Sequence, residues 1–130
     1  MTFEEHIENL EILEGWEARF EYIIELAEEM PALADALKTE ENLVRGCTSR
    51  VWMVEGFDHE NRLNLQMDSD AVLVRGLLAL VKSAYEGVRR DEIASVLFMN
   101  EMEKIGLLAN LSPNRRSGLA SVLAKISSLS

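Results

Sequence analysis

The clearest period-two pattern of apolar residues lies between residues 49 and 67, and helical patterns lie on both sides of it. Every second residue from Leu63 to Met67 is apolar, and an earlier run of strand-forming residues extends from about Ser49 to Phe57. Alternation with period two is typical of a strand with one buried face. We therefore expect a hairpin. Residues 43–45 would add a short strand, giving a small antiparallel sheet of about three strands.

Apolar residues recur at helical spacing in most of the remaining chain. The segments with this pattern are 3–13, 16–30, 71–85, 91–104 and 113–129. The fourth segment reads either as one helix or as two short pieces, with Leu97 among its inward residues. Helices that flank a small sheet predict a single α+β domain over residues 1–130.

Local signals mark where two of these helices begin and how one of them packs. Residues 68–70 supply N-cap candidates for the third helix, and Ser112 supplies one for the last helix, followed by a first-turn proline. Gly76 lies inside the third helix, where glycine is about 1 kcal/mol less favourable than alanine. We therefore expect Gly76 to allow close packing against a neighbouring element.

The charge balance excludes several classes of partner. The chain has 13 basic and 23 acidic side chains, a net charge of −10, which opposes binding to nucleic acid and to anionic lipid. The long apolar stretch from Ala71 to Ala84 contains Arg75 and Lys82, so we expect no membrane span. A single cysteine cannot form an internal disulfide, and the first residues do not resemble a secretory signal. We therefore expect a cytoplasmic protein.

The single cysteine, Cys47, has neighbours that suit a reactive thiol better than a buried one. They are a glycine, two hydroxyl residues and two arginines: Arg45, Gly46, Thr48, Ser49 and Arg50. Small polar residues pack poorly in a core, whereas nearby cations favour the thiolate, which is the nucleophilic form of cysteine. The residues alone leave an inert buried cysteine and a reactive thiol equally open.

The rest of the sequence limits what a reactive Cys47 can do. One cysteine and two histidines, His6 and His59, do not make a metal site, and neither histidine is placed to act as a base for Cys47. The seven glycines never cluster into a phosphate-binding loop. Without a second cysteine, the chain cannot cycle through an internal disulfide. The remaining chemistry is thiol exchange with a sulfur carried by another molecule.

Residues 46–52, Gly-Cys-Thr-Ser-Arg-Val-Trp, resemble the G-C-x-S-x-V-W signature of the SufE family of sulfur-acceptor proteins, which includes CsdE. Further blocks that resemble the family fall in order within residues 16–33, 68–77 and 106–119. The resemblance implies an α+β fold with a small antiparallel sheet flanked by helices. It is similar to the IscU scaffold but lacks the three ligand cysteines of that family.

The resemblance also implies a function and a set of site residues. Proteins of this family take sulfur from the persulfide of a pyridoxal-phosphate cysteine desulfurase of the SufS or CsdA type, stimulate it, and pass the sulfur to a SufBCD-like assembly complex. Cys47 matches the acceptor cysteine, and Arg115 matches an arginine linked to desulfurase contact. We place Asp70 with Arg115 among the partner-binding residues.

These implications describe an accessory protein and not an enzyme. It would hold no cofactor or metal, because the pyridoxal phosphate belongs to the partner. The alternative hypothesis is a regulator that activates a desulfurase by contact alone and carries no sulfur.

Overall fold

The two strands form an antiparallel hairpin, as the alternation of apolar residues predicts. The computed structural model describes residues 1–130. In it, β1 (Val51–Phe57) pairs with β2 (Leu63–Ser69), so that the first residue of β1 lies opposite the last residue of β2. In the turn, Asn61 has a φ of 63°, a left-handed conformation that asparagine adopts more readily than most residues. The carboxylate of Asp58 accepts hydrogen bonds from two backbone amides of the same turn.

The sheet has two strands, and the prediction of about three is wrong in this respect. Leu43 forms only an isolated bridge with Trp52, and the amide of Val44 donates to the carbonyl of Val51 over 2.8 Å. The chain turns away at Gly46, where φ is +91°. Because of this turn, only Leu43 pairs with β1, and the segment does not continue as a third strand.

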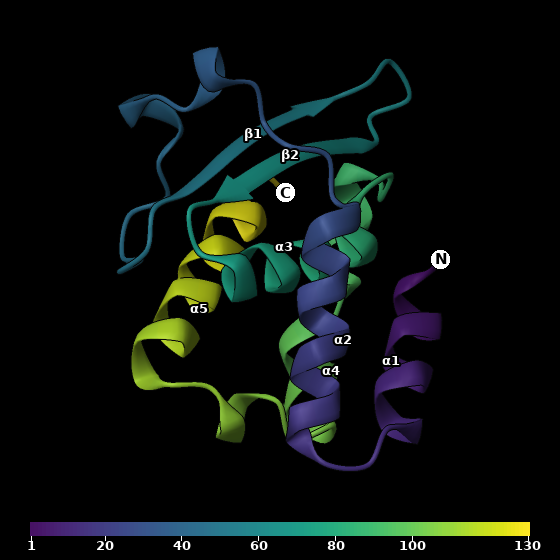
Figure 1. The fold of residues 1–130 in the computed structure, drawn as a ribbon. Helices are drawn as coiled ribbons and strands as arrows, with labels where there is room; N and C mark the ends of the chain where they lie inside the picture. Colours follow the sequence, from purple (N-terminus) through teal and green to yellow (C-terminus); the bar gives the residue numbers. More distant parts are fainter.

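Five helices and four short 3-10 turns make up the rest of the regular structure. The helices are α1 (Phe3–Ile12), α2 (Trp16–Glu29), α3 (Val72–Tyr85), α4 (Phe98–Lys104) and α5 (Pro113–Ser127). The 3-10 turns are η1 (Asp35–Leu37), η2 (Glu40–Asn42), η3 (Arg90–Ser95) and η4 (Leu108–Asn110). Figure 1 shows the hairpin above the helices, with α3 and α5 below it and α2 in front of α3. This arrangement confirms the predicted α+β fold.

The boundaries of three helices test the local signals. Residues 91–104 form two pieces, η3 and α4, and Leu97 is 59% exposed because it lies in the connection between them; its predicted inward position is wrong. The side chain of Ser112 caps α5, as expected. The N-cap of α3 is Ala71, so the prediction that residues 68–70 supply this cap is wrong. Their side chains bind elsewhere: Asp68 pairs with Arg75, Ser69 accepts the amide of Ala71, and Asp70 accepts the amide of Arg50.

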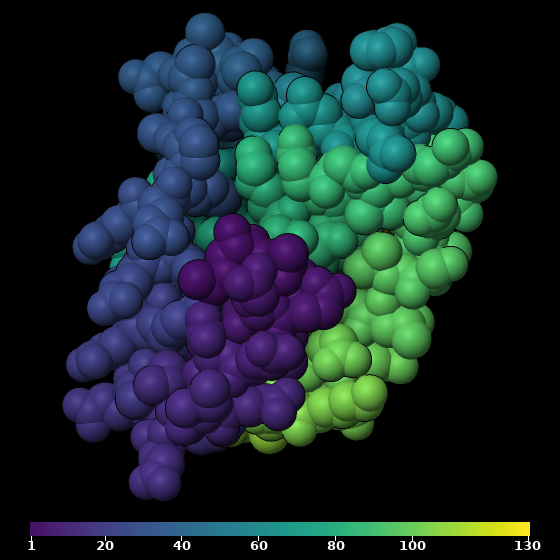
Figure 2. Space-filling view, turned by 90° about the vertical axis from the view of Figure 1, so that its right-hand side faces the viewer, coloured from purple at the N-terminus to yellow at the C-terminus, as the bar shows by residue number.

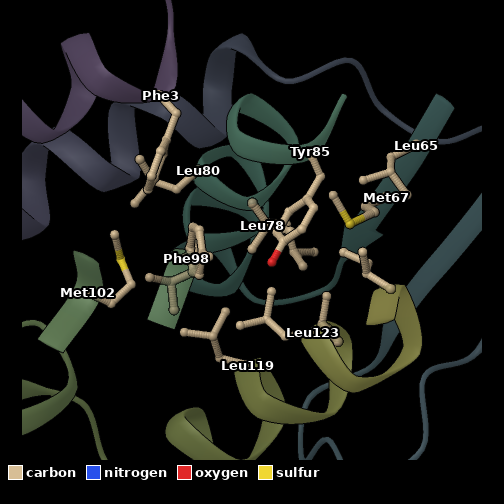
Figure 3. Close-up of a cluster of buried hydrophobic side chains, with 14 of the residues drawn as sticks. Phe3, Leu65, Met67, Leu78, Leu80, Tyr85, Phe98, Met102, Leu119 and Leu123 are labelled. Carbon is tan, nitrogen blue, oxygen red and sulfur yellow. The ribbon is translucent and has the colours of Figure 1, made fainter. Parts of the chain in front are cut away.

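One cluster of buried apolar side chains joins the hairpin to the helices. Figure 3 shows part of it: Leu65 and Met67 of β2, Leu78, Leu80 and Tyr85 of α3, Leu119 and Leu123 of α5, Phe3 of α1, and Phe98 and Met102 of α4. The rings of Phe3 and Phe98 stack at 5.4 Å between centroids, which fixes α1 against α4. None of the helices has the length and apolar character needed to cross a membrane.

Gly76 brings α3 into close contact with α2, as its position inside the helix predicts. A Cβ atom at this position would overlap the backbone carbonyl oxygen of Ile23 and lie 2.8 Å from its carbonyl carbon. Ile23 is fully buried in α2. The backbones of the two helices can therefore approach this closely only where residue 76 has no side chain.

A buried ion pair ties the end of β2 to α3 and to the end of α2. The carboxylate of Asp68, only 3% exposed, pairs with the guanidinium of Arg75 and accepts the amide of Leu33 over 3.0 Å. The second terminal nitrogen of Arg75 donates to the carbonyls of Ala27 and Met30, each over 2.9 Å. Arg75 thereby satisfies carbonyls at the C-terminal end of α2 that have no partner within the helix.

The surroundings of Asp68 favour its charged form. Burial raises the pKa of Asp68, but hydrogen bonds from the amides of Leu33 and Ser69 and the charge of Arg75 outweigh burial, so the pKa lies below its ordinary value. Lys38 adds a second cation at 3.6 Å. The carboxylate therefore remains ionised inside the protein.

A polar contact at a buried position holds α1 against α2. His6 is 7% exposed, and its Nδ1 lies 2.7 Å from the hydroxyl oxygen of Tyr22, which also accepts the side-chain amide of Asn9 over 3.0 Å. On the face shown in Figure 2, α1 (purple) lies between α2 and the green segment that contains α4. Burial lowers the pKa of His6, and the N-terminal ammonium lowers it further.

We predict that Gly76→Ala destabilises the protein, although alanine is normally the better helix former. The added Cβ meets the backbone of Ile23, which cannot move aside as a flexible side chain would. We expect a loss of about 1–3 kcal/mol in the free energy of unfolding, measured by urea denaturation. Gly56→Ala is the control, because its Cβ would have nothing within 4 Å. Equal stability of the two variants would contradict the predicted clash.

We predict that stability falls as the pH drops from about 6.5 towards 5. The pKa of His6 is lowered from its ordinary value of 6.5, so the unfolded chain binds a proton in this range that the folded chain does not bind. Urea denaturation at a series of pH values should show this slope in the wild type and in His59→Gln, in which an exposed histidine is removed. The slope should flatten in His6→Asn; an unchanged slope in that variant would contradict the assignment.

Candidate functional site

The loop that carries Cys47 is attached to the rest of the protein at its ends. It runs from Leu43 to Arg50, between η2 and β1, and lies beside α5 (Figure 1). At its C-terminal end, the amide of Arg50 donates to the Asp70 carboxylate over 3.2 Å, and the amide of Asp70 donates to the Arg50 carbonyl over 3.3 Å. The backbone groups of residues 45–49 form no backbone hydrogen bond with any other part of the chain. The loop around the thiol is therefore held mainly by packing.

Gly46 allows this loop to turn against α5. Its φ of +91° is unfavourable for residues with a side chain, and a Cβ there would lie 2.5 Å from the hydroxyl oxygen of Ser121. Both facts explain why glycine precedes the cysteine. The sharp turn directs the next residue, Cys47, towards the N-terminal half of α5.

The thiol of Cys47 rests on the backbone of α5. The residue is partly buried, and its Sγ donates to the carbonyl oxygen of Gly118 over 3.6 Å. A Cβ atom on Gly118 would lie 3.4 Å from Sγ, an ordinary van der Waals contact, so a methyl group would fit there but a larger side chain would meet the sulfur. Gly118 is a member of the site that sequence reasoning missed, although a glycine inside a helix is itself a signal of close contact.

Cys47 lines a cavity of about 270 Å³ between the loop, the start of β1, α3 and α5. Its apolar wall includes Leu77, Leu78 and Leu119, and its polar rim includes Thr48 and Arg115. Reasoning from sequence did not place the three leucines in the site, because their spacing marks them equally well as core residues. The cavity can hold an additional sulfur atom beside the thiol while restricting water on one side.

Burial, and not charge, dominates the acidity of Cys47. Burial raises the pKa of the thiol above its ordinary value of 9.0, and no neighbouring cation offsets the shift. The role of Arg45 and Arg50 in favouring the thiolate stays a prediction, because neither offsets the effect of burial in this conformation. Both arginines are exposed to water, which screens their charge, while the sulfur lies against apolar side chains.

The structure brings most of the predicted site residues together. Arg115, in the first turn of α5, shares the cavity with Cys47, Thr48 and Ser49. On the other side of the thiol, the loop itself forms a shallower groove lined by its residues: Leu43, Val44, Arg45, Gly46, Cys47, Thr48, Ser49 and Arg50.

Asp70 lines neither of these two cavities. It acts on the loop instead, through its bonds to Arg50. No group of three or more His, Cys, Asp or Glu side chains is arranged to hold a metal ion.

The chain matches the family model described as "SufE: Fe-S metabolism associated domain" over residues 4–130. The chain belongs to the SufE family. An uncharacterized SufE-like protein of Rhizobium etli is 41% identical over 128 residues, covering 96% of this chain and 86% of that protein. Another, of Rhizobium meliloti, is 36% identical over 130 residues, covering 98% of this chain and 93% of that protein.

The fold is shared with a more distant protein of known structure. The solution structure of a hypothetical protein from Thermus thermophilus superposes with a TM-score of 0.78 and covers 99% of this chain and 95% of that one, at 19% sequence identity. Membership of the SufE family associates the present protein with iron–sulfur metabolism. Cys47, whose thiol rests on α5, is the candidate reactive group of this protein.

We predict that Gly118→Val exposes the thiol of this SufE protein. A branched side chain at residue 118 would occupy the space of Sγ and displace it towards water, which lowers the pKa of the thiol towards its ordinary value. We expect the rate of alkylation by iodoacetamide at pH 7.5 to rise by about 3-fold or more. Ala120→Val, on an exposed position of the same helix, is the control and should alkylate at the wild-type rate. An unchanged rate in Gly118→Val would contradict the proposed contact.

Proposed function

We propose that Cys47 accepts sulfur from the persulfide of a pyridoxal-phosphate cysteine desulfurase and carries it to an iron–sulfur assembly complex of the SufBCD type. Membership of the SufE family supports the metabolic setting. The observation that carries the proposal is the position of the only thiol of the chain, in a cavity wall that opens towards solvent. The proposed place of action is the cytoplasm, where a single thiol remains reduced.

The proposed step is a thiol exchange. The thiolate of Cys47 attacks the terminal sulfur of the desulfurase persulfide, forming one S–S bond while the S–S bond in the donor breaks. The donor cysteine leaves as a thiolate, and Cys47 becomes a persulfide. No external oxidant or reductant is needed, because one persulfide is consumed for each one formed. Release of the donor cysteine prepares the desulfurase for another turnover, which is the proposed origin of its stimulation.

The buried resting state suits this role in two ways. A raised pKa keeps Cys47 mainly protonated while the protein is free, so stray electrophiles react with it slowly. After transfer, the apolar wall formed by Leu77, Leu78 and Leu119 would limit access of other thiols to the persulfide. The lack of backbone hydrogen bonds from residues 45–49 to other segments would allow the loop to move outward at low cost when a partner docks.

Two residues outside the loop have proposed roles in docking. Arg115 is exposed at the rim of the cavity and makes no side-chain hydrogen bond within the chain, so its guanidinium is available to a partner. Asp70 fixes one end of the loop through Arg50, and a partner that contacts Asp70 could release that end. Thr48, Ser49 and Gly46 shape the loop around the thiol.

We predict that Cys47 gains one sulfur atom when the protein is mixed with an active cysteine desulfurase and free cysteine. Intact-mass spectrometry should show an adduct of about 32 Da that dithiothreitol removes. Cys47→Ser should show no adduct. Because a serine hydroxyl is nearly isosteric with the thiol, the variant should still bind the desulfurase, as measured by calorimetry.

The same variant separates sulfur carriage from activation by contact. The carrier function requires that Cys47→Ser loses the stimulation of sulfide production while it keeps binding. Full stimulation by Cys47→Ser would instead support the alternative, a regulator that carries no sulfur. Absence of any adduct on the wild type, with a desulfurase shown to be active on cysteine alone, would overturn the proposal.

A further inference from the structure

The basic side chains of this protein divide into two groups by their contacts. Nine of the 13 make an ion pair or a hydrogen bond within the chain: Arg19, Lys38, Arg62, Arg75, Lys82, Arg89, Arg90, Lys104 and Lys125. The other four are Arg45, Arg50, Arg115 and Arg116, whose guanidinium groups have no such partner. All four are exposed. The cations without an internal partner are therefore arginines, from two segments far apart in the sequence.

Three of these arginines surround the thiol. Arg45 and Arg50 line the shallow groove that contains Cys47, and Arg115 lines the deeper cavity on its other side. We call these three residues the arginine collar. Arg116 follows Arg115 in α5 and adds charge to the same end of the helix without lining either cavity.

Acidic residues are absent from the two segments that carry the collar. The sequence contains no Asp or Glu in residues 43–54 or in residues 104–130, although the whole chain has 23 acidic residues and a net charge of −10. No Asp or Glu side chain lines either of the two cavities that contain Cys47. Asp70 lies next to the loop, and its carboxylate accepts the backbone amide of Arg50. The charged side chains that line the two cavities are therefore all arginines, on a protein with a net charge of −10.

The collar has no evident function in the fold. Arg115 and Arg116 lie in the first turn of α5, where cations interact unfavourably with the helix dipole. Neither Arg45 nor Arg50 affects the pKa of Cys47, which is shifted by burial alone. Because these exposed arginines make no stabilising contact within the chain, their charges are available to bind another protein.

We propose that the arginine collar docks on an acidic protein surface surrounding the sulfur donor, and that it steers the approach of this protein so that Cys47 faces the persulfide. This inference rests on the proposed sulfur transfer and adds the chemistry of the partner surface to it. Opposite charges accelerate association, while the negative remainder of the molecule is repelled by the same acidic surface. The two proteins then meet most often in the orientation in which Cys47 faces the partner.

The test measures the rate of association with the cysteine desulfurase of the same cell, immobilised for surface plasmon resonance. The double variant Arg45→Gln/Arg50→Gln should associate about 10-fold more slowly than the wild type at low ionic strength, of the order of 20 mM. The difference should nearly vanish at about 0.5 M salt, where the charges are screened. The dissociation rate should change by less than about 2-fold, as for charges at the rim of an interface.

The matched control is Arg89→Gln/Lys104→Gln, which removes two exposed cations from outside the collar and changes the net charge equally. It should associate at close to the wild-type rate. The collar variant should melt at the wild-type temperature, because its side chains have no internal partners. The control should melt within a few degrees of it, because the ion pairs of Arg89 and Lys104 are exposed and contribute little stability.

Two results would overturn the proposal: a wild-type association rate for the collar variant at low salt, or an equal slowing in the control, which would assign the effect to net charge. If the wild type itself neither binds the desulfurase nor gains sulfur, the proposed function fails. If the wild type gains sulfur and the collar variant associates normally, only the collar inference fails.

Discussion

The buried pair of Asp68 and Arg75 is the polar interaction that fixes the hairpin, α2 and α3 relative to one another. It joins the end of β2 to α3, and through the other hydrogen bonds of Arg75 and Asp68 it fixes the end of α2 and the segment that follows. A buried ion pair adds little net stability relative to apolar packing, but removing one partner leaves an uncompensated charge. The pair therefore serves mainly to fix β2, α3 and the end of α2 in their relative positions. Asp70, two residues further on, holds the loop of Cys47 from the same junction.

The site combines two requirements that oppose each other for a cysteine. A nucleophilic thiol needs a lowered pKa and access to its target, whereas a stored sulfur needs shelter from water and from other thiols. The free protein meets the second requirement, because burial raises the pKa of Cys47 and the sulfur lies against α5. Gly46, with its positive φ and its close contact with Ser121, makes this approach between loop and helix feasible, and Gly118 is the residue of α5 that the thiol contacts. In the proposed function, activation of the thiol takes place when the protein docks on its partner.

The basic side chains near Cys47 differ from those in the rest of the protein in whether they have partners within the chain. Most basic side chains have partners within the chain, and no acidic side chain lines the two cavities that contain Cys47. The exposed arginines near Cys47 do not lower its pKa, because water screens charges at the surface. Burial of the sulfur raises the pKa instead. The guanidinium groups of these arginines make no ion pair or hydrogen bond within the chain, which leaves them available for a partner.

The amino-acid sequence was enough to predict most of the elements, the fold class and the candidate site residue, Cys47. The periods of its apolar residues are strong along α2, β2 and α3, and the G-C-x-S-x-V-W match singles out Cys47. It could not determine the number of bridging residues near Leu43 or the inward turn of Asp68, which depend on partners distant in the chain. The burial of the thiol became visible only in the folded protein. The pKa of Cys47 depends on how α5 excludes water, and local residues contain no information about that contact.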